Sequence, residues 1–173
     1  MVLRALAAAC LLAAPAAGGA QEREFPIEEI AADLAYGFCP LFLAGQFSLT
    51  SPQLAERGFG TTIVKQPHPR VGEMSLVSAL RPDGEIAFGG ASGKACTVIV
   101  GGPKRETVLA RLRDNMAYMG LDFKATANVG AEQPGVTVET FKAPVEGQML
   151  YVQLIQANAP KPTVVAQLFA MDK

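Results

Sequence analysis

Hydrophobic and polar positions change their spacing along this chain, and the change separates predicted helices from predicted strands. Between Pro26 and Tyr36 the apolar side chains stand three or four positions apart, which predicts an amphipathic helix. Pro26 suits the first turn of this helix, and Gly37 suits its end. The apolar stripe consists of Ile27, Ile30, Ala31, Leu34 and Phe38.

Two further helices are predicted. Pro52 to Arg57 should form a short one, because Ser51 is a favourable N-cap and Gly58 a favourable stop. The longest helix should follow Gly101-Gly102-Pro103, and Gly120 is placed to cap its end. Its apolar stripe, again at spacings of three and four residues, is formed by Val108, Leu109, Leu112, Met116 and Met119.

Between the short helix and the longest one the period falls to two, which is typical of strands. A first strand, Thr61–Lys65, should stop at the Pro67-His68-Pro69 break. Pro82-Asp83-Gly84 is a strong hairpin-turn signal between the next two strands. The strands expected after the first are Glu73–Leu80, Glu85–Phe88 and Lys94–Val100.

Four more strand-like segments follow the longest helix, separated by short loops that contain glycine and proline. Sequential strands joined by short turns favour antiparallel neighbours. The sequence therefore predicts an α+β fold, in which the N-terminal helix and the central amphipathic helix pack on one face of a mainly antiparallel sheet. The four segments are Asp122–Val129, Gly135–Lys142, Gln148–Ala157 and Thr163–Met171.

The N-terminus has the pattern of a secretory signal peptide. One positive charge, Arg4, precedes an apolar run over residues 5–17, and small residues then precede a charged stretch. We expect cleavage before Gln21, so that residues 1–20 are removed and residues 21–173 form a single exported α+β domain. The expected location is periplasmic or secreted.

The same N-terminal segment has two alternative interpretations. A membrane anchor would need about 20 apolar residues to cross about 30 Å of hydrocarbon, whereas this run is shorter and contains Pro15. Lipid attachment at Cys10 is disfavoured because most of the apolar run lies after that cysteine. The cleaved form, with no membrane span, is therefore favoured.

Cleavage leaves two cysteines, Cys39 and Cys96. An isolated pair in a small exported domain usually closes, so we expect a disulfide, which for a loop of this length contributes about 4 kcal/mol. Cys96 shares a strand face with Val98 and Val100, so the bond should tie the first helix to the sheet. A catalytic thiol or a metal site would need a nearby base or more ligands than a single histidine supplies.

Composition argues against several functional classes. Without Arg4 the chain has 14 basic and 16 acidic residues, so nothing directs it to nucleic acid or anionic lipid. The stretch Gly89–Lys94 fails as a phosphate-binding loop, because Phe88 stands where the first glycine is required and Ala95 follows the lysine. We expect a flexible loop there, and we expect no cofactor, no metal site and no catalytic residue.

His68, the only histidine, lies in a segment that its flanking prolines should keep extended and exposed. Binding residues often occupy such ordered, exposed loops. His68, Arg70 and Lys94 are therefore the candidate contacts with a ligand or partner. The partner is not defined by the sequence, and another protein of the cell envelope is the candidate.

The functional hypothesis favoured by the sequence is an exported, non-catalytic binding or accessory protein, because no base–nucleophile set is visible. Two alternatives stay open. An inhibitor or immunity-type protein would block an exported enzyme with the loop Gln66–Gly72. A hydrolase would use residues that only the fold brings together, with His68 as the candidate base.

Overall fold

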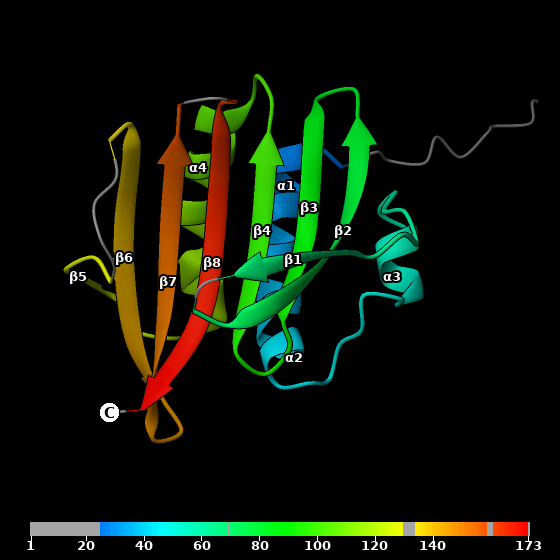
Figure 1. The fold of residues 1–173 in the computed structure, drawn as a ribbon. Helices are drawn as coiled ribbons and strands as arrows, with labels where there is room; N and C mark the ends of the chain where they lie inside the picture. The colour runs from blue at the N-terminus through cyan, green and yellow to red at the C-terminus, as the bar shows by residue number, and fades with distance from the viewer. Residues whose placement is uncertain (1–24, 69, 130–133, 159–160, 173) are drawn as a thin grey trace, which may run out of the picture.

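The computed structural model describes residues 25–68, 70–129, 134–158 and 161–172, so the signal-peptide pattern lies outside the described residues. Within the described ranges one antiparallel sheet has eight strands in the order β1-β2-β3-β4-β8-β7-β6-β5 (Figure 1). The strands are β1 Val64–His68, β2 Gly72–Arg81, β3 Gly84–Ala91, β4 Ala95–Gly101, β5 Lys124–Thr126, β6 Val136–Val145, β7 Gln148–Ala157 and β8 Thr163–Asp172.

The sheet consists of two four-stranded meanders that meet at its centre. β1 to β4 follow the N-terminal helix, β5 to β8 follow the central helix, and each meander runs from one edge of the sheet inward. β4 and β8 pair antiparallel in the middle. The two halves therefore repeat the same order of helix and strands. In the strand order, a twofold axis between β4 and β8 would relate one meander to the other.

The N-terminal helix, α1 (Ile27–Asp33), and the central helix, α4 (Arg105–Asn115), lie side by side on one face of the sheet (Figure 1). Glu28 and Glu29 of α1 form ion pairs with Lys104 and Arg111, at 3.7 and 2.7 Å. The predicted α+β fold, with an antiparallel sheet and both helices on one face, is confirmed.

The N-terminal helix is longer than the sequence predicted. α1 continues through the π-helical turn η1 (Leu34–Phe38) into α2 (Cys39–Leu43). The prediction that Gly37 ends the helix is wrong, because the residues beyond it are still apolar and their burial outweighs the local preference of glycine. Within η1 the buried Tyr36 hydroxyl donates to the Leu112 carbonyl at 2.6 Å, and burial raises the pKa of this tyrosine.

Cys39 and Cys96 form the predicted disulfide, with their Cα atoms 5.4 Å apart. The predicted end of the helix at Gly37 would place Cys39 after the helix. In the structure Cys39 is the first residue of α2, so it lies inside the continuous helical segment. Cys96 lies in β4 on the face that packs against the helices, together with Val98 and Val100. The bond therefore ties the helix to the centre of the sheet, and both cysteines are 0% exposed.

The two other predicted helices are present. In α3 (Pro52–Ala55) the Ser51 hydroxyl accepts a hydrogen bond from the Gln53 N–H, as expected of an N-cap, and the helix is shorter than predicted. The 3-10 turn η2 (Met116–Met119) extends α4, and Gly120 ends it in the left-handed conformation, with φ 67°. The predicted cap at Gly120 is confirmed.

Two strands, both at the edges of the sheet, differ from their predictions. β1 was expected at Thr61–Lys65 but covers Val64–His68, with Pro67 inside it. An edge strand tolerates proline because one of its sides has no neighbouring strand. β5 is limited to Lys124–Thr126, whereas Asp122–Val129 was expected. The other strands begin within one residue of their predicted starts, and of these only β3 and β6 end more than one residue beyond the prediction, each by three residues.

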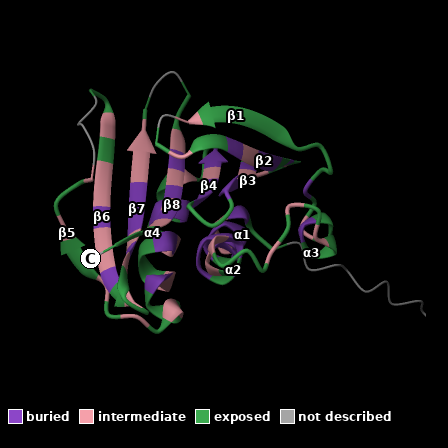
Figure 2. Cartoon of the chain, turned by 60° about the horizontal axis from the view of Figure 1, so that its bottom comes forward, coloured by how far each residue is buried: buried purple, intermediate pink, exposed green. Residues whose placement is uncertain are grey.

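The hydrophobic core lies between the helices and the sheet (Figure 2). The sheet contributes alternate residues of its central strands, as its period of two requires. The helices contribute their apolar stripes. The largest fully buried side chains are Phe88, Ile27, Leu34, Leu54, Ile86, Leu112, Leu154, Leu168, Val77, Val98, Val108 and Val152.

Candidate functional site

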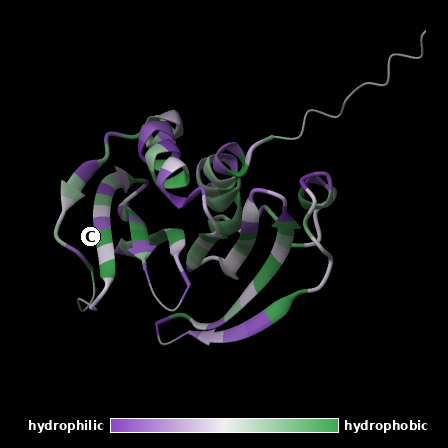
Figure 3. Ribbon diagram, turned by 90° about the horizontal axis from the view of Figure 1, so that it is seen from above, coloured by the Kyte–Doolittle hydropathy of each residue, from purple (hydrophilic) through white to green (hydrophobic). Residues whose placement is uncertain are grey.

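None of the described helices packs on the other face of the sheet, and we call it the helix-free face. Figure 3 shows α1 and α4 on one side of the sheet and the β1–β2 hairpin on the other. Side chains alternate along a strand, so residues that are paired across neighbouring strands share a face. The register therefore defines rows of side chains that cross the helix-free face from strand to strand.

The β1–β2 hairpin folds across part of the helix-free face, where β1 crosses in front of β3 and β4 (Figure 1). Four apolar side chains on this face are at most 9% exposed: Met74, Leu76, Ala91 and Ala95. Because the helices lie on the opposite side, the hairpin is the element that covers these residues.

Gly89 and Gly90 permit the close approach of the strands at this place. Their φ angles are 149° and 145°, and a Cβ atom on either would lie 2.1 Å from a carbonyl oxygen, that of Ser75 or that of Ala95. Only glycine avoids both clashes. The prediction of a flexible loop over Gly89–Lys94 is therefore wrong for its first half, since β3 runs to Ala91.

The tip of the hairpin is attached to the opposite edge of the sheet. Arg70 Nη1 donates to the carbonyl oxygen of Val129 at 3.0 Å, and Gln153 Nε2 donates to the same oxygen at 3.2 Å. Val129 follows β5, which is the edge strand farthest from β1. Segments from both edges thus meet over β7, and we call this contact the bridge.

A row of hydroxyl and amide side chains crosses the helix-free face at the level of the bridge. This polar row consists of Thr97, Gln167, Gln153 and Thr140, which are successive partners across β4, β8, β7 and β6. Thr97, Gln153 and Thr140 are only 3–4% exposed. Gln153 Nε2 also donates to Thr140 Oγ1 at 3.2 Å, so part of the row is joined by hydrogen bonds.

An apolar row lies next to the polar row. It consists of Ile99, Val165, Ile155 and Val138, again successive partners across the same four strands. All four side chains are partly exposed. A solvent-facing side of an antiparallel sheet usually carries polar residues at such positions.

A lysine–aromatic row lies on the other side of the polar row. Its members are Lys124, Lys142, Tyr151 and Phe169, which are successive partners across β5, β6, β7 and β8. The Tyr151 and Phe169 rings are stacked, with centroids 5.3 Å apart and an interplanar angle of 6°. Lys124 forms an exposed ion pair with Asp122 at 2.7 Å.

The helix-free face has an unusual charge pattern over β4 to β8. On this face of the described strands β4 to β8 the charged side chains are those of Lys124 and Lys142, and these strands place no carboxylate on it. The two lysines are directly opposite each other, an arrangement of like charges that destabilises a strand pair. This end of the face therefore favours an anion.

The structure brings together two of the three predicted contact residues. His68 and Arg70 are at the hairpin tip, where the Arg70 N–H donates to His68 Nδ1 at 3.3 Å. Lys94 is an exposed residue of the turn between β3 and β4, and its N–H donates to the Ala91 carbonyl. No hydrogen bond or ion pair of the described residues joins Lys94 to the hairpin tip.

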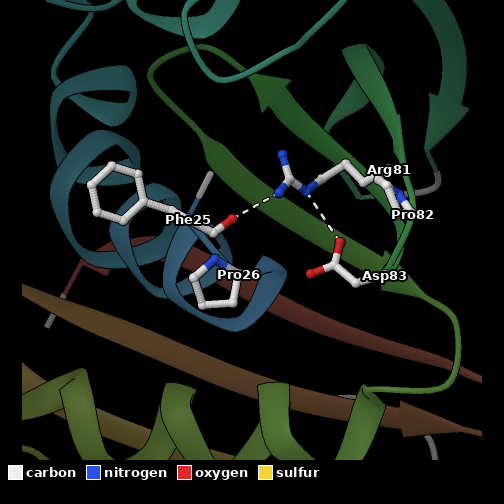
Figure 4. A pocket seen from close by; sticks show the side chains of 5 residues that line it. All are labelled: Phe25, Pro26, Arg81, Pro82 and Asp83. Atoms are coloured by element: carbon white, nitrogen blue, oxygen red, sulfur yellow. Dashed lines mark hydrogen bonds and ion pairs between the residues drawn. The ribbon is translucent and has the colours of Figure 1, made fainter. Parts of the chain in front are cut away.

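A separate cavity of about 270 Å³ lies at the start of α1 (Figure 4). Arg81 donates to the Phe25 carbonyl at 2.7 Å and to Asp83 at 3.3 Å, while Asp83 accepts from the Ile27 N–H at 2.9 Å. These polar groups are thus engaged in fixing α1 to the β2–β3 turn. We interpret this cavity as part of the helix anchor. Its lining residues are Phe25, Pro26, Arg81, Pro82 and Asp83.

The described part of the chain lacks two further features. No group of three or more histidine, cysteine, aspartate or glutamate side chains there is placed to hold a metal ion. None of the helices in those ranges is both long and apolar enough to span a bilayer.

Comparison with known proteins gives no relative: the chain matches no protein-family profile, no curated protein and no solved structure. The candidate site therefore depends on geometry alone.

Most of the site was not predicted from the sequence. Alternation in Gln148–Ala157 and Thr163–Met171 indicates which residues share a face, but only the register places Tyr151 beside Phe169. Of the predicted contacts, Arg70 is part of the bridge. The signal that could have pointed to the site is the set of apolar residues on both faces of these two strands.

Proposed function

We propose that this chain is an exported, non-catalytic binding protein whose ligand occupies the helix-free face of the sheet. The observation that carries the proposal is the partly exposed apolar row, flanked by the buried polar row and, beyond it, by stacked aromatic rings. Contiguous exposed apolar side chains on one face are characteristic of sites for ligands or partners. A few fixed polar groups among apolar ones are typical of a binding site.

Binding, and not catalysis, fits the chemistry of the described residues. His68 lies on the exposed hairpin tip, and its ring nitrogen accepts a hydrogen bond from a backbone N–H. A catalytic base needs a nucleophile or water in reach and a group that orients it. Within the described ranges no hydrogen bond links His68 to a serine, a threonine or a carboxylate.

Export is part of the proposal. The N-terminal pattern, which predicts cleavage before Gln21, supports it, and the Cys39–Cys96 disulfide is compatible with an oxidising compartment. Expression of the full chain in a bacterium, followed by mass determination of the protein from the periplasm, tests this part. We expect a chain that begins at Gln21; an uncleaved chain retained in the cytoplasm would refute it.

One observation favours the inhibitor hypothesis as a second candidate. The bridge holds Arg70, which belongs to the predicted inhibitory segment Gln66–Gly72, against Val129, and a segment fixed in advance loses less entropy when it binds. Replacing this segment with a short glycine turn should leave the fold intact and abolish inhibition of the target enzyme. If the ligand instead occupies the helix-free face, ligand binding should survive replacement of this segment.

The proposal is tested with the dye N-phenyl-1-naphthylamine, which fluoresces in apolar sites. We expect the purified chain to enhance its fluorescence and the double variant Ile155→Thr/Val165→Thr to reduce this at least about fivefold, since threonine keeps the β-branched shape but is polar. Leu41→Gln, which removes an apolar side chain 40% exposed on α2, is the matched control. Equal fluorescence from all three proteins would contradict the proposal, as would turnover of a hydrolase substrate by the purified chain.

A further inference from the structure

We propose that the lysine–aromatic row binds an amphipathic carboxylate, namely the anion of a long-chain fatty acid. This inference depends on the proposed function and names the class of ligand. The row holds two cations at one end and two stacked rings at the other, all on the same face of four adjacent strands. A ligand with an acidic head and an apolar body matches both ends.

The head group is assigned from charge. Lys124 and Lys142 are paired across β5 and β6, so their Cβ atoms are about 5 Å apart. Asp122 neutralises Lys124, whereas Lys142 has no ion pair or hydrogen bond with any described residue. A carboxylate between the two ammonium groups would relieve their repulsion and give Lys142 a partner.

Lys142 is also less exposed than a typical surface lysine. Its side chain is only partly accessible, beside the Tyr151 ring on the neighbouring strand. Ion pairs gain strength when they are partly shielded from water, because solvent screens them less. Lys142 is therefore the principal contact with the head group, and the exposed Lys124 contributes less.

The apolar body is assigned from the rest of the row and its neighbours. Tyr151 and Phe169 offer adjacent ring surfaces, and Met149 and Met171 form the next pair on the same two strands. Met171 is 44% exposed. Methionine side chains adapt to flexible aliphatic chains, because they are unbranched and polarizable.

The length of this surface suits a flexible chain. From Lys142 on β6 to Phe169 on β8 the row crosses three strands, and neighbouring strands are about 4.8 Å apart. The surface beyond Lys142 thus extends for roughly 10 Å, and the exposed Met171 beside Phe169 continues it for the rest of an alkyl chain. The described strands β4 to β8 carry no carboxylate on this face, and the Asp122 carboxylate next to β5 is already paired with Lys124.

The test uses sodium dodecanoate, 1-dodecanol and dodecyltrimethylammonium, which share one alkyl chain and differ in charge. Calorimetry or amide NMR shifts with the full exported chain should show the order dodecanoate, then dodecanol, then the cation. Lys142→Gln should weaken dodecanoate about tenfold and leave dodecanol unchanged, because it removes only a charged contact. Lys124→Gln should have a smaller effect. Tyr151→Ala should weaken both.

Lys65→Gln is the matched control. It removes the same charge from β1. Lys65 forms an ion pair with Glu73, its side chain is 66% exposed, and it lies on the side of the hairpin that faces away from the site. This control should bind dodecanoate as the unmodified chain does. Circular dichroism of each variant confirms that a loss of binding does not come from unfolding.

Three results would overturn the inference, and they differ in what they mean for the proposed function. Equal binding of dodecanol and dodecanoate, or no effect of Lys142→Gln, would leave an apolar site without anion recognition. Co-sedimentation with phosphatidylglycerol vesicles but no binding of free dodecanoate would indicate a membrane surface as the ligand. No amide shift on the helix-free face with any of the three probes would contradict the proposed function as well.

Discussion

Gly89 and Gly90 are the residues on which the shape of the helix-free face depends most directly. Each has a backbone conformation that L-amino acids rarely adopt, and each faces a carbonyl oxygen of a neighbouring strand. The hairpin can cover Leu76 and Ala95 only while these strands stay close.

We predict that Gly89→Ala lowers the free energy of unfolding by at least about 3 kcal/mol, because the added Cβ clashes with the Ser75 carbonyl and the φ angle is strained. Gly93→Ala is the control: φ is 74° there, but no atom lies within 4 Å of the added Cβ, so about 1–2 kcal/mol is expected. Urea unfolding measures both. Equal losses would show that the close approach is unimportant.

Glu146 shows the opposite situation, a residue that could be improved. It occupies the turn between β6 and β7 with φ 43°, followed by Gly147 at φ 90°. Two-residue hairpins of this kind prefer asparagine before glycine, because asparagine tolerates positive φ. Glu146→Asn should therefore raise the free energy of unfolding by about 0.5–1 kcal/mol. A lower midpoint of urea unfolding would argue against this account of the turn.

Local signals at single residues were predictable from the sequence where no tertiary contact opposed them. Ser51 and Gly120 act within one turn of chain, and both cap helices as predicted. Gly37 carries a similar signal but is overridden, because apolar residues on both sides of it belong to the core. The disulfide was predictable because the expected mature chain has only two cysteines, and an isolated pair in a small domain usually closes under oxidising conditions.

At the level of elements, α4 is held to β6 by the ion pair between Arg113 and Glu139. Arg113 Nε donates to Glu139 Oε2 at 2.9 Å, and a second guanidinium N–H donates to the other carboxylate oxygen. Hydrogen bonding by Arg113 lowers the pKa of Glu139 below its usual 4.5. The contact between α4 and β6 therefore depends on the ionised form of the Glu139 carboxylate.

The sign of the pH effect follows from this shift. Because the pKa of Glu139 is lower in the folded state, its stabilisation is complete above about pH 4.5 and is lost as the pH falls through the folded value. Arg113→Ala should lower stability at pH 7 by less than about 1 kcal/mol, since both side chains are a third or more exposed. The difference from the unmodified chain should shrink as the pH falls below about 4.5. A double-mutant cycle with Glu139→Gln, measured by urea unfolding at pH 7 and across the acidic range, checks this; a difference that grows as the pH falls contradicts it.

The strands at the centre of the sheet were predictable because alternation over many residues defines them, as in Gln148–Ala157, which is β7. The edge strands were not. Pro67 lacks a backbone N–H and therefore predicts the end of a strand. β1 nevertheless continues through it, because one side of an edge strand has no neighbouring strand and needs no N–H donor there. β5 ends at Thr126, and three residues later the Val129 carbonyl oxygen accepts hydrogen bonds from the side chains of Arg70 and Gln153. No local sequence pattern encodes these long-range bonds.

At the level of the whole molecule, the disulfide joins the two layers through the middle of the core. The double variant Cys39→Ala/Cys96→Ala should lower the free energy of unfolding by about 4 kcal/mol, because the bond closes a loop of 57 positions. Urea unfolding under oxidising conditions measures the loss. A loss below about 1 kcal/mol would mean that the unfolded chain is not restrained by the bond.

Burial gives the disulfide a second measurable property. Both cysteines are 0% exposed, so a reductant reaches the sulfurs only when the core opens. We expect the native chain to resist dithiothreitol until urea is added, as judged by the mass of the alkylated product. Rapid reduction of the folded chain would contradict the described burial.

The rows that form the candidate site are a property of the whole sheet, and this is why the sequence alone did not reveal them. Lys124 and Phe169 belong to the same row but lie on strands separated by β6 and β7. Their proximity requires the order of all the strands between them to be known. The sequence could predict which side chains share a strand face, and the register then decides which of them meet.

The pairing of β4 with β8 has a consequence for how the chain folds. Every other neighbouring pair in the sheet is consecutive in sequence and can form as a local hairpin, whereas this pair must wait until α4 and three intervening strands have been synthesised and placed. Non-local pairing is the slow step in folding, because chain entropy is lost before the contacts are gained. We therefore expect the centre of the mature sheet to assemble last, from two half-molecules that are already largely built.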